Sequence, residues 1–155
     1  MTAIGIIGAR KYKDRQSVID LVDTLPADCV VITSSCRGVC TWAGTAAKAR
    51  GLAVRIFSPD LTDLRDHFDM VERYYRRNRE LIAVCDIVHA FISKEGGLTG
   101  GTKYEVRYAR SMGKRVILHR EGGRVQCLNQ RTLPFGGRET GFSTAWMRFF
   151  SETLA

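Results

Sequence analysis

The stretch DIVHAFISKEGGLTGGTKYEVRYARSMGKRVILH, residues 86–119, contains the most informative pattern in the sequence. An apolar run, DIVHAFI, leads into a glycine-rich loop, then a basic segment of helical character, then a second apolar run, RVILH. Two short apolar runs separated by a helix predict two parallel strands joined by a crossover helix. The segment therefore predicts a βαβ unit with a glycine-rich loop where its first strand ends.

The same alternation continues towards the N-terminus. Strands are expected at residues 3–8, 28–33 and 52–57, and helices at residues 16–25, 40–51 and 66–84. Strands that alternate with helices indicate a parallel sheet covered on both faces, with right-handed crossovers. We therefore expect an α/β fold: one Rossmann-like domain at residues 1–120, with a doubly wound, mostly parallel sheet of five strands and helices on both faces.

The end of the chain has a different character. Residues 121–155 contain glycine pairs and then STAWMRFF, which is typical of a short amphipathic helix. We expect this segment to be a C-terminal extension packed on the same domain. Its apolar side chains would cover the core or serve self-association, and we expect a homodimer or a higher homo-oligomer.

Composition narrows the classes of function. The chain has 155 residues and a net charge of +8, which favours anionic partners. No apolar run approaches the roughly 20 residues that span a bilayer, and no secretory signal pattern begins the chain. Five cysteines form an odd set, and Cys36 and Cys40 lack a second pair of zinc ligands. We expect a cytoplasmic protein with no membrane partner, metal or cofactor.

Ligands of such sheets bind at the carboxyl ends of the strands, where the strand order reverses. Gly8, Ala9 and Arg10 follow the first strand, where glycine permits a tight turn and Arg10 is suited to pair with a phosphate. A plain surface position for Arg10 is an equally good interpretation. The loop is neither the dinucleotide-binding fingerprint nor a P-loop.

The loop after the second strand is a second candidate. Ser34, Ser35, Arg37 and Gly38 stand just before a helix, whose N-terminal amides attract anions. Ordinary capping of the helix by serine explains the same residues equally well.

The loop after the fourth strand is the strongest candidate. Thr99, Gly100, Gly101 and Thr102 let backbone amides face an anion at the start of a helix, and Glu105 lies one turn further on. A carboxylate beside a phosphate is unfavourable unless it has a task, such as holding a ribose hydroxyl or acting at an anomeric carbon. The alternative is a first-turn glutamate that complements the helix dipole.

Basic residues are concentrated in two places. One lies on the helix at residues 66–84, where arginines 73, 76, 77 and 79 stand among two tyrosines, and the other follows the glycine loop. Such a helix is usually a solvated face, but arginine with tyrosine also suits stacking on bases. Arg77 and Asn78 precede the fourth strand and are placed to reach the end of the sheet.

Taken together, these motifs resemble the SLOG superfamily of Rossmann-like nucleotide-binding proteins. Its relatives include LONELY GUY phosphoribohydrolases, DprA proteins and YspA-like domains, and the resemblance covers about residues 3–119. Gly101, Thr102 and Glu105 match a Gly-Thr-x-x-Glu signature that is also similar to nucleoside 2-deoxyribosyltransferases. Ser34 and Ser35 replace two glycines of the family pattern, and Cys40 stands where aspartate is usual.

The resemblance implies catalytic roles for Glu105 and Arg77, and a ligand site in the three loops and Asn78. The first hypothesis is an enzyme that cleaves or transfers at the N-glycosidic bond of a nucleotide or nucleoside. The second is a sensor that binds such a small molecule without changing it. The third is DprA-like binding of single-stranded nucleic acid, ranked below a small-molecule partner.

Overall fold

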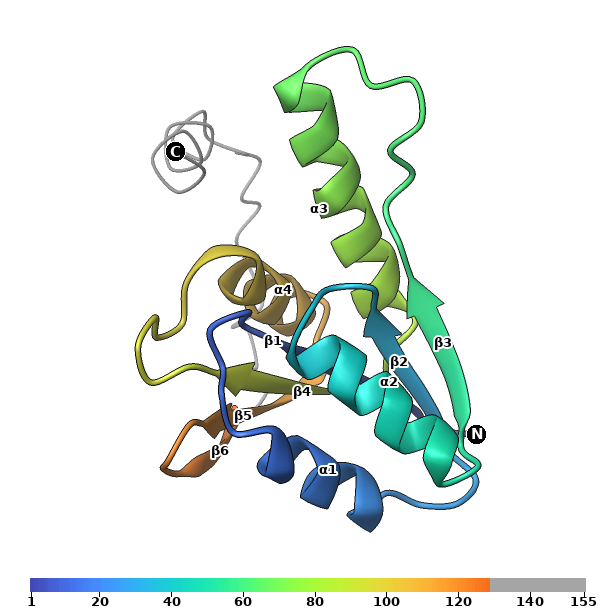
Figure 1. Ribbon diagram of the computed structural model, residues 1–155, viewed down its shortest axis with the longest axis vertical. Coiled ribbons are helices and arrows are strands. Elements are labelled where there is room, and N and C mark those ends of the chain that lie inside the picture. Colours follow the sequence, from blue (N-terminus) through green and yellow to red (C-terminus); the bar gives the residue numbers. More distant parts are fainter. Residues whose placement is uncertain (129–155) are drawn as a thin grey trace, which may run out of the picture.

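A six-stranded sheet forms the centre of the computed structural model, which describes residues 1–128 (Figure 1). The strands are β1 (Ala3–Gly8), β2 (Val30–Ser34), β3 (Ala53–Phe57), β4 (Ile87–Ile92), β5 (Arg115–Arg120) and β6 (Val125–Leu128). Their order is β3-β2-β1-β4-β5-β6, and all neighbours are parallel except β5 and β6. The α/β class, the Rossmann-like topology and the mostly parallel sheet are thereby confirmed.

The sixth strand was not predicted. β6 pairs with β5 after a tight turn in which Gly122 has a φ of 66° and Gly123 N donates to Arg120 O. The strand is four residues long and its first three residues are exposed, so it carries no apolar alternation that a sequence pattern could detect. The remaining residues of the expected extension, including Trp146, lie outside the described residues.

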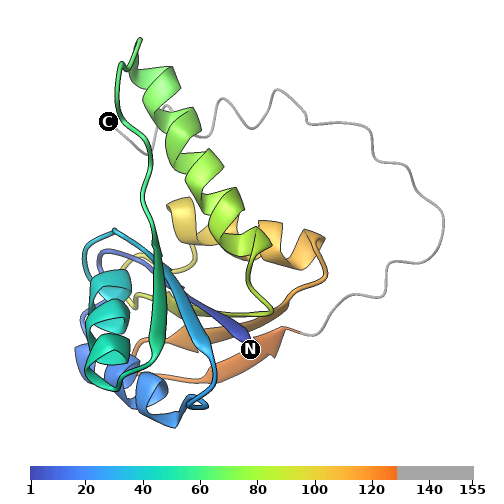
Figure 2. The same ribbon diagram turned by 90° about the vertical axis from the view of Figure 1, so that its right-hand side faces the viewer.

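Four helices cover the sheet: α1 (Arg15–Thr24), α2 (Val39–Ala49), α3 (His67–Ala83) and α4 (Gly100–Ser111). α1 and α2 pack together on one face, and α3 and α4 pack together on the other (Figures 1 and 2). Asp14 and Asp66 begin α1 and α3, each accepting a hydrogen bond from a first-turn amide. Within residues 1–128, no helix combines the length and hydropathy that crossing a membrane requires.

Each face of the sheet buries its own apolar cluster. Ile6, Val22 and Val31 belong to the cluster under α1 and α2, and Leu81 and Val106 belong to the cluster under α3 and α4. Strands covered on both faces must be apolar on both sides, which is why β1, β2 and β4 read as continuous apolar runs.

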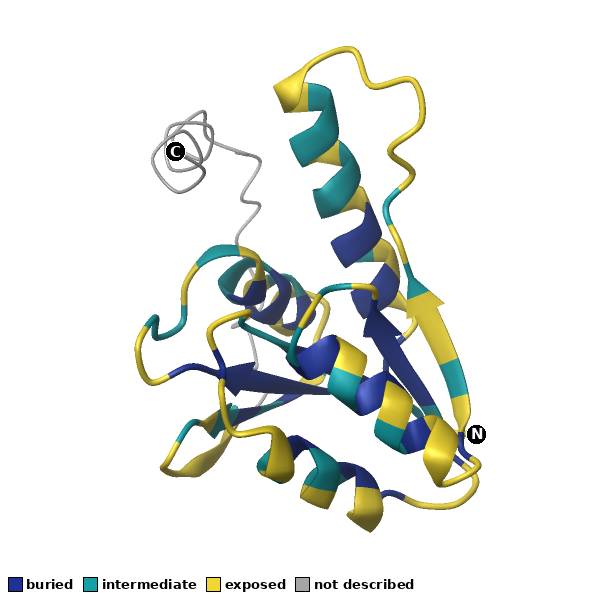
Figure 3. Cartoon of the chain, in the orientation of Figure 1, coloured by how far each residue is buried: buried dark blue, intermediate teal, exposed yellow. Residues whose placement is uncertain are grey.

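The helix α3 differs from the other three in its exposure. Its C-terminal half is buried against the sheet, whereas its N-terminal half stands beyond the sheet edge (Figures 2 and 3). The buried half carries Arg77 and Asn78, so the helix delivers these two polar side chains to the end of the sheet.

Candidate functional site

Three loops lie side by side at the carboxyl edge of the sheet, where the strand order reverses between β1 and β4. A Cβ added to Gly38, in the loop after β2, would lie 3.8 Å from Arg10 O. A Cβ added to Gly96, in the loop after β4, would lie 3.9 Å from the Lys11 Cδ atom. The loop after β1 therefore contacts both of the others, and one surface is made from all three.

Arg77 and Asn78 bring α3 into the same region. Arg77 is 5% exposed, and its Nε donates to Asn78 Oδ1 at 2.8 Å. Its Nη1 lies 3.4 Å from Phe57 O at the end of β3. The guanidinium also lies over the ring of Tyr74, with Cζ 5.7 Å from the ring centroid. A Cβ on Gly101 would lie 3.8 Å from Asn78 Nδ2, which places Asn78 beside the first turn of α4.

Glu105 is buried behind that turn, on the sheet-facing side of α4. Its side chain is 7% exposed, and burial raises the pKa of Glu105 to about 7, while the positive charge of Arg77 acts to lower it. A carboxyl group with a pKa near neutrality can both donate and accept a proton at physiological pH. This property distinguishes Glu105 from a solvated first-turn glutamate.

Two cysteines complete the surroundings of Glu105 and Arg77. Arg77 Nη2 lies 3.5 Å from Cys36 Sγ, in the loop after β2. Burial raises the pKa of the Cys40 thiol, a hydrogen bond with Ser34 lowers it, and the charge of Glu105 raises it further. The sequence indicated Cys36 and Cys40 as possible metal ligands and placed Cys40 at a position where the family has aspartate. Their nearness to Arg77 and Glu105 was not predictable, because it follows from the packing of α2 against the sheet.

The helices α2 and α4 both begin at this edge without a side-chain cap. The N-cap of α2 is Gly38, which has a φ of 85° and no side chain. The N-cap of α4 is Thr99, whose hydroxyl donates to Gly96 O instead of accepting from the helix. The first-turn amides of both helices therefore lack the usual side-chain acceptor, so an anion can take that place.

The predicted ligand residues differ in accessibility. Arg10, Ser35, Arg37, Thr99 and Gly101 are exposed, so they form the outer surface of the three loops. The more enclosed members are Gly8, Ala9, Ser34, Gly38, Arg77, Asn78, Gly100, Thr102 and Glu105. The exposed residues can contact a ligand directly, whereas the enclosed residues pack under the loops and hold them in place.

Glu121, at the end of β5, ties two of the loops together. Its carboxylate accepts from Lys13 N at 2.6 Å, from Asp14 N at 3.2 Å and from Lys94 N at 2.9 Å. These hydrogen bonds lower the pKa of Glu121. The amides at residues 13–14 are therefore already occupied, and the loop after β1 offers a ligand its side chains. Glu121 was missed because its partners lie up to 108 residues away.

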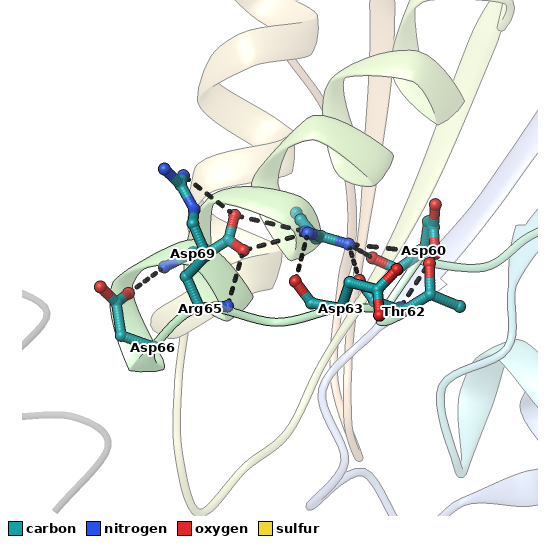
Figure 4. A network of polar contacts seen from close by, with 7 residues as sticks. Asp60, Thr62, Asp63, Arg65, Asp66 and Asp69 are labelled. Carbon is teal, nitrogen blue, oxygen red and sulfur yellow. Dashed lines mark hydrogen bonds and ion pairs between the residues drawn. The ribbon is translucent and has the colours of Figure 1, made fainter.

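The arginines of α3 have structural partners. Arg73 contacts Asp60, Thr62, Asp63 and Asp69 (Figure 4), and Arg79 pairs with Glu72 at 2.7 Å. Arg77 is buried, which leaves Arg76 as the exposed member of the four. Three of the four arginines therefore contact other parts of the protein, and base stacking by this helix, one of its two interpretations, stays a prediction.

Comparison with known proteins identifies the fold. No family model matches the chain, and neither does any curated protein. DNA processing protein A from Streptococcus pneumoniae has a TM-score of 0.62 at 15% identity, over 99% of this chain and 57% of that one. DNA processing protein A from Helicobacter pylori has a TM-score of 0.57 at 18% identity, over 76% of this chain and 64% of that one.

This chain shares the fold of the DprA proteins. The fold that the resemblance implied is confirmed, and DprA was among the relatives that the motifs indicated. The Helicobacter pylori protein binds single-stranded DNA. The chain spans less than two thirds of the length of either protein.

Proposed function

We propose that this chain binds single-stranded nucleic acid through its phosphates, at the surface made by the loops after β1, β2 and β4. The observation that carries the proposal is the pair of uncapped helix starts, α2 and α4, at one edge of the sheet. Amides at a helix N-terminus attract anions, and two such sites beside each other suit successive phosphates of a strand.

Exposed cations surround these helix starts. Arg10 and Arg37 are exposed on adjoining loops, and a net charge of +8 adds a general attraction for a polyanion. This function ranked third on the residues alone. It now ranks first because the similar solved structures include a protein that binds single-stranded DNA.

The proposal is tested by fluorescence anisotropy with a labelled single-stranded oligonucleotide over a series of salt concentrations. Binding should weaken steeply with salt, because each neutralised phosphate contributes about −0.7 to the slope of log K against log salt. Arg10→Ala and Arg37→Ala should each weaken binding and make the slope shallower by about 0.7.

Lys48→Ala is the matched control. Lys48 is an exposed cation in the last turn of α2, at the opposite end of that helix, so its loss changes the net charge equally without touching the loops. Its salt slope should equal that of the unmodified chain. The proposal is overturned if the oligonucleotide fails to bind at the lowest salt, or if Lys48→Ala has the same effect as Arg10→Ala.

A second candidate function is cleavage or transfer at the N-glycosidic bond of a nucleotide. The observation that favours it is the buried Glu105, with a pKa raised to about 7 beside Arg77. A group of this kind suits protonation of a leaving base or stabilisation of an oxocarbenium-like carbon.

This candidate is separated from the first by product analysis. The chain is incubated with a panel of nucleotides, and chromatography is used to detect free base. Base release that disappears in Glu105→Gln would support catalysis, and tight binding of an unchanged nucleotide would support the sensor hypothesis. Base release and nucleotide binding are measured separately from the salt dependence of oligonucleotide binding. The two candidate functions can therefore be tested independently.

A further inference from the structure

An exposed apolar tip lies at the far end of α3. Leu61, Leu64 and Phe68 are 39%, 38% and 81% exposed, in the loop after β3 and the first turn of α3. Single exposed apolar residues are common on protein surfaces, but three within eight positions form a patch that indicates a contact surface. Figure 3 shows this end of the helix and the loop beside it as exposed.

The tip is held in one shape by Arg73. Its guanidinium donates to Asp60 O at 3.0 Å, to Thr62 O at 2.5 Å and to Asp69 Oδ2 at 3.0 Å (Figure 4). The loop carbonyls thus have fixed partners on the helix. A preorganised surface loses less conformational entropy on association, which suits the tip to binding.

The charge of the tip is opposite to that of the chain. Residues 60–69, here called the acidic tip, contain four aspartates and one arginine, and Arg73 pairs with two of those aspartates, so the segment together with Arg73 carries −2 in a chain of net charge +8. A partner for this surface should therefore be basic and partly apolar.

A surface of that kind lies at the other end of the same helix. Val84 and Met112, which end α3 and α4, are 38% and 42% exposed. Lys114 Nζ donates to Ala83 O at 3.1 Å, which joins the C-terminal ends of the two helices. Residues 80–86 and 107–115, here called the basal surface, carry cations at positions 107, 110, 114 and 115 against Glu80 and Asp86.

We propose that the acidic tip of one copy of this chain docks on the basal surface of a second copy. The two surfaces lie at opposite ends of a 17-residue helix, so about 25 Å separates them. The acidic tip of one copy therefore cannot contact the basal surface of the same copy. Phe68 is the apolar anchor and meets Val84 and Met112 of the second copy. Asp63 and Asp66 face Arg110 and Arg115, which sets the orientation.

Such a contact is head-to-tail, because each copy uses two different surfaces. A contact of this type continues from copy to copy until a ring closes, whereas a two-fold contact stops at a dimer. The proposal therefore predicts a weight-average mass that keeps rising with protein concentration and falls with added salt.

Sedimentation velocity on the full chain tests this without nucleic acid. Phe68→Arg places a cation beside the basic residues that flank Val84 and Met112, and Met112→Glu places an anion beside the aspartates that flank Phe68. Each variant should associate at least about tenfold more weakly than the unmodified chain, since both remove an anchor and add repulsion. Val125→Arg is the control, because Val125 is 66% exposed on β6, away from both surfaces, and should leave association unchanged.

Mixing the two variants gives the deciding result. The Phe68→Arg copy retains its basal surface and the Met112→Glu copy retains its tip, so the mixture should form one-to-one dimers and nothing larger. If Met112→Glu associates as strongly as the unmodified chain, the contact is tip to tip and the proposal is wrong. A chain that stays monomeric at every concentration overturns the proposal too.

Discussion

The guanidinium of Arg77 lies 3.5 Å from Cys36 Sγ, across 41 positions of sequence. The same side chain reaches Asn78 Oδ1 and Phe57 O, so one arginine joins α3 to the ends of β2 and β3. Arg77 therefore holds the loop that precedes α2. The residue that the family resemblance assigns to catalysis also positions the surrounding loops.

We predict that Arg77→Ala lowers the free energy of unfolding by about 2–4 kcal/mol, because it leaves buried hydrogen-bonding groups without a partner. Arg76→Ala is the control: the neighbouring arginine is exposed, and its loss should change stability by about 0.5 kcal/mol or less. Urea unfolding of both variants measures the difference. Equal effects would mean that the contacts of Arg77 do not stabilise the fold.

The buried carboxyl group of Glu105 predicts a pH dependence of stability. Its pKa is raised from 4.5 to about 7, so the folded chain binds the proton more tightly than the unfolded chain does. Stability from this group is fully present below pH 4.5 and is lost as the pH rises through 7. By pH 8 the loss amounts to about 3 kcal/mol.

Glu105→Gln removes this ionisation while keeping the size of the side chain. The difference in unfolding free energy between the variant and the unmodified chain should shift by about 3 kcal/mol in favour of the variant between pH 4.5 and pH 8. Urea unfolding at several pH values gives this difference directly. A constant difference across the range would show that Glu105 ionises like a solvated carboxyl group.

The sheet was predictable from the sequence because apolar runs and glycine loops are local signals. The three loops were predicted to meet because the carboxyl ends of parallel strands share one edge. The role of Glu121 was not predictable, since its carboxylate caps amides that become neighbours only when β5 joins the sheet. Local patterns indicate which loops lie together but do not identify the hydrogen bonds that join them.

The arginines of α3 show a second limit of sequence reasoning. Arg73 and Arg76 are three positions apart and look equivalent in a pattern of basic residues. Only the structure shows that Arg73 faces the aspartate-rich loop while Arg76 is exposed. The direction of each side chain depends on where the loop after β3 returns to the helix.

The ion pair between Arg73 and Asp69 should make the acidic tip less stable at low pH. The hydrogen bond from Arg73 lowers the pKa of Asp69 to about 2. The stabilisation from Asp69 is present above its ordinary pKa of 3.8 and is lost as the pH falls towards 2. We expect the amides of residues 60–66 to gain hydrogen exchange, relative to those of β1, as the pH falls through this range.

Arg73→Ala should release the same segment at neutral pH. The amides of residues 60–66 should then exchange faster than in the unmodified chain, while those of β1 and β4 remain protected. Arg79→Ala is the control, because Arg79 pairs with Glu72 on the helix and does not contact the loop. Equal exchange in Arg73→Ala and the unmodified chain would show that the loop holds its shape without Arg73.

Gly8 illustrates how the reason for a glycine can differ from the predicted one. Gly8 was predicted to permit a tight turn, but its φ is not among the positive values in the structure. A Cβ at Gly8 would instead lie 2.7–2.8 Å from three side-chain atoms of Val39, the first residue of α2. The glycine is required by close packing between β1 and the start of α2.

A double-mutant cycle tests this relationship. Gly8→Ala should destabilise the chain by about 1–3 kcal/mol through overpacking against Val39. In Gly8→Ala combined with Val39→Ala, both Cγ atoms of Val39 are removed and only its Cβ remains within 2.8 Å of the new methyl group, so the overpacking is partly relieved and the two single losses should sum to more than the measured loss. Gly44→Ala is the control, because a Cβ there would meet Thr33 at an ordinary 3.7 Å and should stabilise α2 by about 0.5–1 kcal/mol. Strict additivity of Gly8→Ala and Val39→Ala would show that the backbone of β1 moves away from α2 rather than pressing against it.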